Sequence, residues 1–163
     1  MRWTGVLLAA AFGLTLHGCG YHWGLLYPAD VRTVHVKMFD NTTFYHESEV
    51  NLTQAVKDAI TQQTPLKVRS AEEADSILTG TITQVEAQVS AYDQSDQIFT
   101  QNVTVRVDFE WRRRDTGKVI ASASGLSFTR RRMAPRGETR ADTMDRTFRD
   151  LAQLIVERMQ ENF

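Results

Sequence analysis

The chain has 163 residues with almost balanced charge: 19 Lys and Arg, 20 Asp and Glu, and a formal net charge of −1 at pH 7. This balance argues against a nucleic-acid-binding protein, which typically carries a marked excess of basic residues. The length suits a single domain, and the sequence contains no internal repeat and no low-complexity tract.

The N-terminus has the features of an export signal. Arg2 precedes an apolar run of twelve residues, Gly5 to Leu16. A membrane-spanning helix needs about 20 residues, so this run is too short to cross a bilayer. A positive start, a short apolar stretch and small residues at its end are typical of a secretory signal peptide. The sequence therefore predicts that residues 1–18 are removed from the mature protein.

The only cysteine follows this run directly, in Leu16-His17-Gly18-Cys19. The segment resembles a bacterial lipobox, although His17 stands where a small or aliphatic residue is usual. A buried or metal-binding cysteine is the alternative, but a lone cysteine forms no intramolecular disulfide and no ligand-type spacing surrounds this one. We expect Cys19 to carry acyl chains, palmitate among them, that anchor the protein to the membrane. Gly20 replaces the Asp that would signal inner-membrane retention, which favours the periplasmic face of the outer membrane.

The first elements follow a short tether, residues 19–30. Val31 to Met38 alternates apolar and polar residues, which predicts a half-buried strand. Asp40 to Thr43 is a turn signal. A helix should follow and end before Pro65, and Leu66 and Val68 indicate a brief strand. The apolar face of that helix is spaced by three and four residues: Leu52, Val56, Ala59 and Ile60.

Three longer strands come next. Ile77 to Ala91 alternates with a phase slip, which a bulge near Thr83-Gln84 would reconcile. Asn102 to Trp111 has all its apolar residues on one face. Asp115 to Lys118 is a hairpin turn signal, and Val119 to Arg130 is the returning strand. Residues 92–101 between the first two strands are polar and predict a loop.

A long amphipathic helix ends the chain, with Thr139 as its N-cap. Its apolar stripe consists of Ala141, Met144, Phe148, Leu151, Ala152, Ile155 and Met159. The order of elements predicts an α+β fold, a two-layer sandwich in which two helices pack on a mixed sheet of four to five strands. Residues 31–163 would form this single domain.

Charge is unevenly distributed along the chain. Residues 40–101 hold 3 basic and 10 acidic residues, whereas residues 102–149 hold 12 and 6. The second region contains two arginine triplets, and a hairpin of the two strands would place one triplet at each end of the two-stranded ribbon. Guanidinium groups bind phosphate and carboxylate in a bidentate manner, so the triplets are candidates for binding lipid A or phospholipid headgroups. Alternatively, they pair with acids of the protein itself. They are Arg112, Arg113, Arg114, Arg130, Arg131 and Arg132.

No catalytic motif is present. The sequence lacks G-x-S-x-G, H-E-x-x-H and a glycine-rich phosphate loop. His22, His35 and His46 are scattered and lack the spacing of a zinc site. We expect neither a metal nor a cofactor. A cell-wall enzyme, with clustered acids or a Ser/Lys pair in a pocket, stays open as an alternative.

Four segments, in this order, resemble one known family: Cys19 to His22 (CGYH), Phe39 to Thr43 (FDNTT), Ala74 to Gly80 (ADSILTG) and Arg114 to Ile120 (RDTGKVI). Together with the lipobox, they are similar to the lipopolysaccharide (LPS)-assembly lipoprotein family, LptE. The resemblance implies the same two-layer fold and a role without catalysis.

Members of that family plug the lumen of the outer-membrane β-barrel LptD, help it to assemble and assist LPS insertion into the outer leaflet. The resemblance implies LptD as a partner and LPS as a candidate ligand, and the lipid anchor implies contact with the membrane. No nucleic acid is expected. The alternative function is an auxiliary lipoprotein of an ABC-type lipid-trafficking system, which would have inner-membrane partners.

Overall fold

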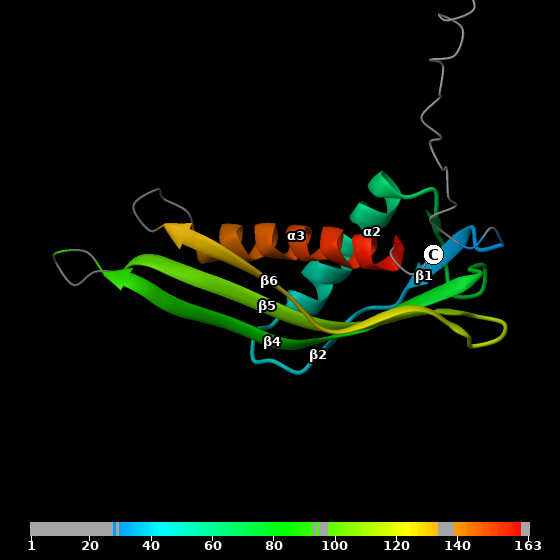
Figure 1. Ribbon diagram of the computed structural model, residues 1–163, viewed down its shortest axis with the longest axis horizontal. Coiled ribbons are helices and arrows are strands. Elements are labelled where there is room, and N and C mark those ends of the chain that lie inside the picture. Colours follow the sequence, from blue (N-terminus) through cyan, green and yellow to red (C-terminus); the bar gives the residue numbers. More distant parts are fainter. Residues whose placement is uncertain (1–27, 29, 93, 95–97, 134–138, 161–163) are drawn as a thin grey trace, which may run out of the picture.

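A computed structural model describes residues 28, 30–92, 94, 98–133 and 139–160 (Figure 1). The predicted signal segment and Cys19 lie outside these residues, as does all of the tether except Pro28 and Asp30. The elements in chain order are β1 (Thr33–Val36), β2 (Asp40–Asn41), α2 (Ser48–Gln63), β3 (Lys67–Val68), β4 (Ser76–Tyr92), β5 (Ile98–Arg113), β6 (Val119–Met133) and α3 (Arg140–Gln160).

The strands form one mixed sheet in the order β3-β1-β4-β5-β6, and β2 also pairs with β4. β1 runs parallel to β3 and β4, and β2 runs parallel to β4. The β4–β5 and β5–β6 pairs are antiparallel. The predicted α+β sandwich is confirmed. The sheet has six strands because Asp40 and Asn41, predicted as part of a turn, pair in parallel with Thr81 and Ile82 before the chain turns.

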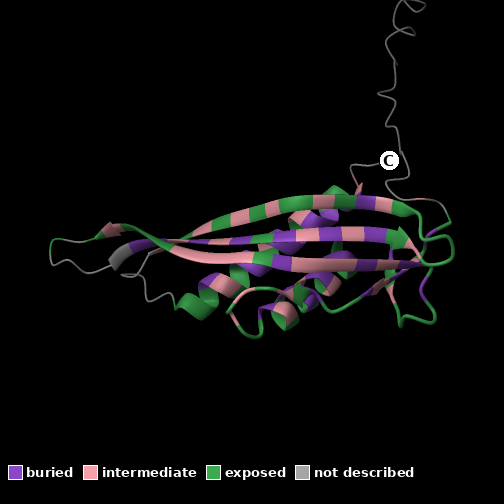
Figure 2. Ribbon diagram, turned by 90° about the horizontal axis from the view of Figure 1, so that it is seen from below, coloured by how far each residue is buried: buried purple, intermediate pink, exposed green. Residues whose placement is uncertain are grey.

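Both helices cover the same face of the sheet (Figure 2), and the core lies between these two layers. Every second residue of β5 points into the core, as the alternation predicted. These side chains are all buried: Val103, Val105, Val107, Phe109 and Trp111. The far ends of β4, β5 and β6 extend beyond both helices in Figures 1 and 2.

Two details of the long strands match the sequence expectations. The β4–β5 register shifts between Ile82 and Gln84, where the bulge was predicted. Gly117 in the β5–β6 turn has φ +68°, a conformation that glycine adopts without steric cost. By contrast, the loop predicted for residues 92–101 is wrong in its second half. Ile98 to Gln101 belong to β5, because their backbones pair with β4 although the segment that precedes them is polar.

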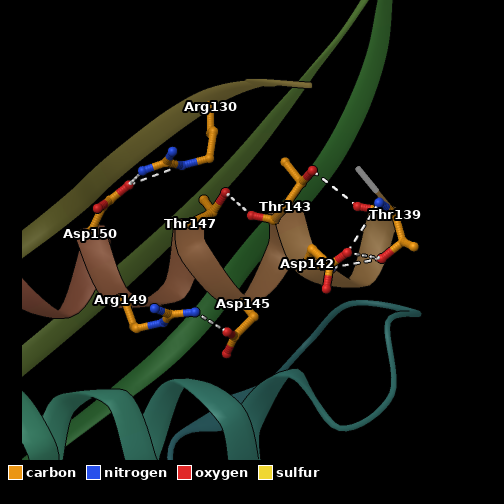
Figure 3. Close-up of polar contacts among 8 residues, drawn as sticks. All are labelled: Arg130, Thr139, Asp142, Thr143, Asp145, Thr147, Arg149 and Asp150. Atoms are coloured by element: carbon orange, nitrogen blue, oxygen red, sulfur yellow. Dashed lines mark hydrogen bonds and ion pairs between the residues drawn. The ribbon is translucent and has the colours of Figure 1, made fainter. Parts of the chain in front are cut away.

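The last helix begins at Arg140 and is capped by Thr139, as predicted. Its stripe is buried or half-buried except for Ala141, which is exposed. Ala141 lies in the first turn, so it is next to the open end of the helix and not over the core. Arg130 of β6 and Asp150 of α3 form an ion pair that ties the helix to the sheet (Figure 3).

Candidate functional site

The two arginine triplets lie at opposite ends of the β5–β6 hairpin, as predicted. Arg112 pairs with Val119 next to the turn, whereas Arg130 pairs with Val103 far along β5. Strands rise about 3.4 Å per residue, so roughly 30 Å of strand separates the two places. The triplets therefore cannot contact the same small anion.

The first triplet is engaged by its own domain. Arg113 makes a two-pronged contact with Asp30, with Nη2 2.6 Å from Oδ1 and Nη1 bonded to Oδ2. This hydrogen-bonded pairing lowers the pKa of Asp30 and raises the pKa of Arg113. Arg114 Nη1 donates to the carbonyl oxygens of Ala71 (3.1 Å) and Glu72 (2.5 Å). Arg112 Nε lies 3.5 Å from Glu110 Oε1.

The second triplet is engaged in part (Figure 3). Arg130 donates through Nε and Nη2 to Asp150 Oδ2, with the Nε distance at 3.1 Å. Arg132 Nη1 donates to Gln101 Oε1 at 3.1 Å. Arg131 is exposed, and within the described part of the chain its side chain makes no hydrogen bond or ion pair. Much of this arginine-rich surface thus serves to hold the fold together.

A shallow groove of about 470 Å³ lies over β4, β5 and β6 beside the β1–β2 connection. Its charged residues have both signs, with Lys37 and Arg112 near Asp40, Asp108 and Glu110. The rest of the lining is mostly small and polar, from serines, threonines and Gly80. The groove contains no histidine and no cysteine. Its one lysine, Lys37, forms no hydrogen bond with Ser122 or Ser124 within the described residues, so the groove shows no activated serine.

The histidines of the described residues, His35 and His46, belong to no group that could hold a metal ion. His35 Nδ1 lies 3.1 Å from the carbonyl oxygen of Arg69, a contact between β1 and the residue that follows β3. Across residues 28–160, leaving out the undescribed gaps, no group of three His, Cys, Asp or Glu side chains could hold a metal ion. Cys19 and His22 lie outside the described residues.

The segment Ala74 to Gly80 joins β1 to β4. Asp75 Oδ2 accepts three hydrogen bonds from β1 and its flank: from Thr33 Oγ1 (2.7 Å), Thr33 N (3.0 Å) and Arg32 N (3.0 Å). These bonds lower the pKa of Asp75, with the Thr33 hydroxyl contributing most. Ser76 Oγ donates to the Thr33 carbonyl (2.8 Å) and accepts from Trp111 Nε1 (2.9 Å). This segment is structural.

The segment Phe39 to Thr43 shapes the approach to α2. Asn41 Oδ1 accepts from Thr43 N (2.9 Å), while its Nδ2 donates to the Tyr45 carbonyl and to Glu49 Oε2 at 2.8 Å each. These contacts hold a tight loop whose next residue, Phe44, is 99% exposed. Phe44 is not among the residues predicted from the sequence, because exposure of a single aromatic residue leaves no periodic signal.

No helix among the described residues is long and apolar enough to span a membrane. Comparison with curated proteins gives no match.

Solved structures share the fold. A PelC dodecamer from Paraburkholderia phytofirmans is 17% identical with a TM-score of 0.59, over 82% of this chain and 93% of that one. Uncharacterized lipoprotein B from Nitrosomonas europaea is 15% identical, with a TM-score of 0.56 over 82% and 84% of the two chains. A Xanthomonas campestris protein is 13% identical, with a TM-score of 0.56 over 83% and 90%. At these identities the likeness concerns the fold alone.

A protein-family model also matches this chain and identifies its family, which fold similarity alone does not. The model described as "LptE: Lipopolysaccharide-assembly" matches residues 31–159, which is most of the chain and covers every described helix and strand except the last residue of α3. The chain therefore belongs to the LptE lipopolysaccharide-assembly family.

Proposed function

We propose that this protein is a lipid-anchored component of the outer membrane that plugs and helps to assemble the β-barrel LptD. In that role it assists LPS insertion into the outer leaflet and catalyses no reaction. The observation that carries the proposal is the family match over residues 31–159. The lipobox-like segment before Cys19 supports the anchor.

The architecture is compatible with a plug. The sheet face opposite the helices exposes small polar and charged side chains, including Thr79, Thr81, Ser122 and Ser124 around the groove. The lumen of a large outer-membrane barrel is polar, so such a face can lie against it without burying unpaired apolar surface. Two helices behind the sheet give the body rigidity.

The anchor would fix the orientation of the domain. Asp30 is bonded to Arg113 at the end of β5, and it lies eleven positions after Cys19 in the sequence. An extended chain spans at most about 3.6 Å per residue, so this end of the domain would lie within roughly 40 Å of the acylated cysteine. Arg112 to Arg114 would then be the triplet nearer the anchor, and Arg130 to Arg132 the one farther away.

Anion binding by the arginine triplets is part of the proposal, but the six arginines differ in how far they are available to a ligand. Arg113, Arg114, Arg130 and Arg132 already have partners in the domain. Arg131 is exposed, and the side chain of Arg112 is about half exposed beside Glu110. These two are therefore the residues that we expect to contact LPS phosphates or other lipid phosphates first.

Affinity purification of the mature, membrane-extracted protein tests the proposal, with mass spectrometry of what stays bound. The matched control is Cys19→Ser, which cannot be acylated. A large outer-membrane barrel recovered in near-equal amount with the wild type supports the plug function. Recovery of inner-membrane transporter subunits contradicts it and favours the auxiliary role in an ABC-type system. Recovery of no partner contradicts it as well.

A further inference from the structure

One edge of β4 is unpaired over half of its length. β1 pairs with Ser76 to Leu78, and β2 pairs with Thr81 and Ile82. From Thr83 to Tyr92 no strand of the described chain pairs with this edge, while the other edge stays paired with β5. Figure 1 shows β4 continuing past β2 with no neighbour on that side.

The backbone groups on this edge belong to the apolar residues of the strand. Ile82 directs its carbonyl outward, because that carbonyl accepts from Thr42 N at 3.1 Å. Before the bulge, even-numbered residues of β4 direct their N–H and C=O groups away from β5. Thr83 is the extra residue of the bulge, so beyond it the odd-numbered residues direct these groups away from β5. Val85 and Ala87 therefore present their N–H and C=O groups to solvent at this edge. Their side chains lie on the helix-facing side, opposite Val105 and Val103.

Between the bulge at Thr83 and the register shift after Val89, this edge lacks the usual protection against strand addition. Exposed edges in natural proteins carry lysine, proline, bulges or inward charges. The opposite edge of the sheet, β6, has the Gly125 bulge and the Arg130 to Arg132 triplet. The β4 edge from Thr83 to Val89 alternates apolar and polar residues and contains no lysine, arginine or proline.

The surroundings of the edge are acidic. Neither residues 38–56 nor residues 70–105, which build the edge and its flank, contain a lysine or an arginine. Glu86 is held by two amides, Gln84 Nε2 (2.9 Å) and Gln88 Nε2 (2.7 Å). Within the described residues no ion pair involves Glu86, and the nearest strand cation is Arg106, which pairs with Gln84 one strand away.

An aromatic residue stands at the point where the pairing stops. Thr42 Oγ1 also donates to the Ile82 carbonyl, at 2.9 Å, and so fixes the loop after β2 to the start of the free edge. Phe44 in this loop is 99% exposed, and Val50 in the first turn of α2 is 50% exposed. These residues offer apolar contact to a segment entering along β4.

We propose that an extended segment of a partner protein, alternating apolar and basic residues, adds to the sheet along β4 from Thr83 to Val89. Its backbone would bond to Val85 and Ala87, and its cations would lie toward Glu86. A second copy of this chain is disfavoured because two acidic edges would meet, each with its own Glu86. The inference rests on the proposed function only for the existence of a protein partner.

Site-specific photo-cross-linking of the full-length, membrane-bound protein tests the proposal. A photo-reactive amino acid is placed at Gln84 in one variant and at Gln88 in another. The two variants should react with partner residues about four positions apart in one segment, because paired strands have the same rise per residue. The same amino acid at Ser127 on the β6 edge is the matched control and should not reach that segment. Cross-links to a second copy, to residues 1–27 of this chain, or to scattered partner positions would overturn the proposal.

Proline variants separate edge pairing from general contact. Ala87→Pro removes an outward N–H and leaves the β5 ladder intact, and Ser127→Pro does the same at the β6 edge. We expect at least a tenfold loss of the Gln88 cross-link in the first and no loss in the second. An unchanged yield with a folded Ala87→Pro protein would contradict the inference.

If Ala87→Pro fails to fold, Glu86→Lys gives the same test without changing the backbone. Glu86→Lys should reduce the yield of the Gln88 cross-link at least fivefold, and Glu86→Gln should reduce it less. Equal yields in wild type and both variants would contradict a partner segment with basic residues. The proposed function fails separately. If the barrel co-purifies but the β4 edge gives no in-register cross-link, only this inference is wrong. If an in-register segment belongs to another protein, only the barrel assignment is wrong.

Discussion

The ring of Phe39 occupies the space above Gly80. A Cβ built on Gly80 would lie 2.3 Å from Phe39 Cε1 and 2.9 Å from the carbonyl oxygen of Asp108. Phe39 is buried at 2% exposure, so its ring has no solvent side to move into. The segments Phe39 to Thr43 and Ala74 to Gly80, which resemble family motifs, thus pack directly on one another.

We predict that Gly80→Ala destabilises the domain by about 1–3 kcal/mol, the range for overpacking in a tight core. Phe39→Leu in the same chain should recover part of that loss, since the shorter side chain opens room for the methyl group. Urea unfolding followed by far-UV circular dichroism measures both. Ser124→Ala, at an exposed position, is the control and should change stability by less than about 0.5 kcal/mol. If Gly80→Ala matched this control, the close contact would be irrelevant to stability.

The second prediction concerns Asp75, whose pKa is lowered by the hydrogen bonds from Thr33 and Arg32. A carboxyl group with a lowered folded pKa stabilises the fold fully above its usual value of 3.8, and this stabilisation disappears as the pH falls through the folded value. Asp75→Asn should cost about 1 kcal/mol at pH 7, a modest figure because the group is exposed to solvent.

The difference between wild type and Asp75→Asn should then shrink below pH 3.8. Unfolding curves at pH 7, 4 and 2.5 give the two free energies at each pH. If the difference in unfolding free energy stayed constant across that range, the stabilising effect of Asp75 would not depend on its charge.

A third prediction follows from the buried contact between Trp111 and Ser76, both with 0% exposure. Ser76→Ala removes the oxygen that accepts from the indole N–H and that donates to the Thr33 carbonyl. Loss of buried hydrogen-bond partners costs about 1–3 kcal/mol. Tryptophan fluorescence during urea unfolding reports the change, with Ser122→Ala on the exposed sheet face as control. Similar midpoints for the two variants would contradict the prediction.

The layers of the fold could be predicted from the sequence because apolar periodicity is a local signal. The strand from Asn102 to Trp111, the bulge near Thr83 and the cap at Thr139 are set by a few neighbouring residues. The strand at Ile98 to Gln101 and the pairing of Asp40 were not predicted, since short segments next to polar turns give no clear periodicity and tertiary contacts with β4 and β6 decide them.

The candidate site was accessible from sequence only in outline. The hairpin signal at Asp115 to Lys118 was enough to separate the two arginine triplets. The partners of Arg113 and Arg130 are Asp30 and Asp150, 83 and 20 residues away. No spacing rule connects residues so far apart, and therefore the choice between an anion site and internal pairing needed the structure.

The fourth prediction concerns the start of α3 (Figure 3). Thr139 Oγ1 accepts from Asp142 N at 3.1 Å, and Asp142 Oδ2 accepts from Thr139 N at 3.2 Å and from its hydroxyl at 2.7 Å. These bonds lower the pKa of Asp142. Thr139→Ala should destabilise the domain by about 1 kcal/mol, measured by thermal unfolding. Asp145→Ala breaks only the exposed contact with Arg149 and should cost less. Equal costs would argue against the cap.

The last prediction separates the structural and the ligand-binding roles of the second arginine triplet. Arg130 is bonded to Asp150 and joins β6 to α3, whereas the neighbouring Arg131 is exposed. Arg130→Gln should lower the free energy of unfolding by about 1 kcal/mol. Arg131→Gln should leave it unchanged, but should weaken binding to LPS micelles or anionic phospholipid vesicles, with the difference shrinking at high salt.

Binding and stability are measured on the same purified variants, by vesicle co-sedimentation and urea unfolding. Asp150→Asn is the matched control, because it releases Arg130 without removing any cation. If Arg130 is held away from anions by its ion pair, Asp150→Asn should bind vesicles more strongly than wild type. If instead Arg131→Gln binds as well as wild type and Asp150→Asn binds no better, the second triplet is a structural feature of the β6–α3 contact, and anion binding must be sought at Arg112.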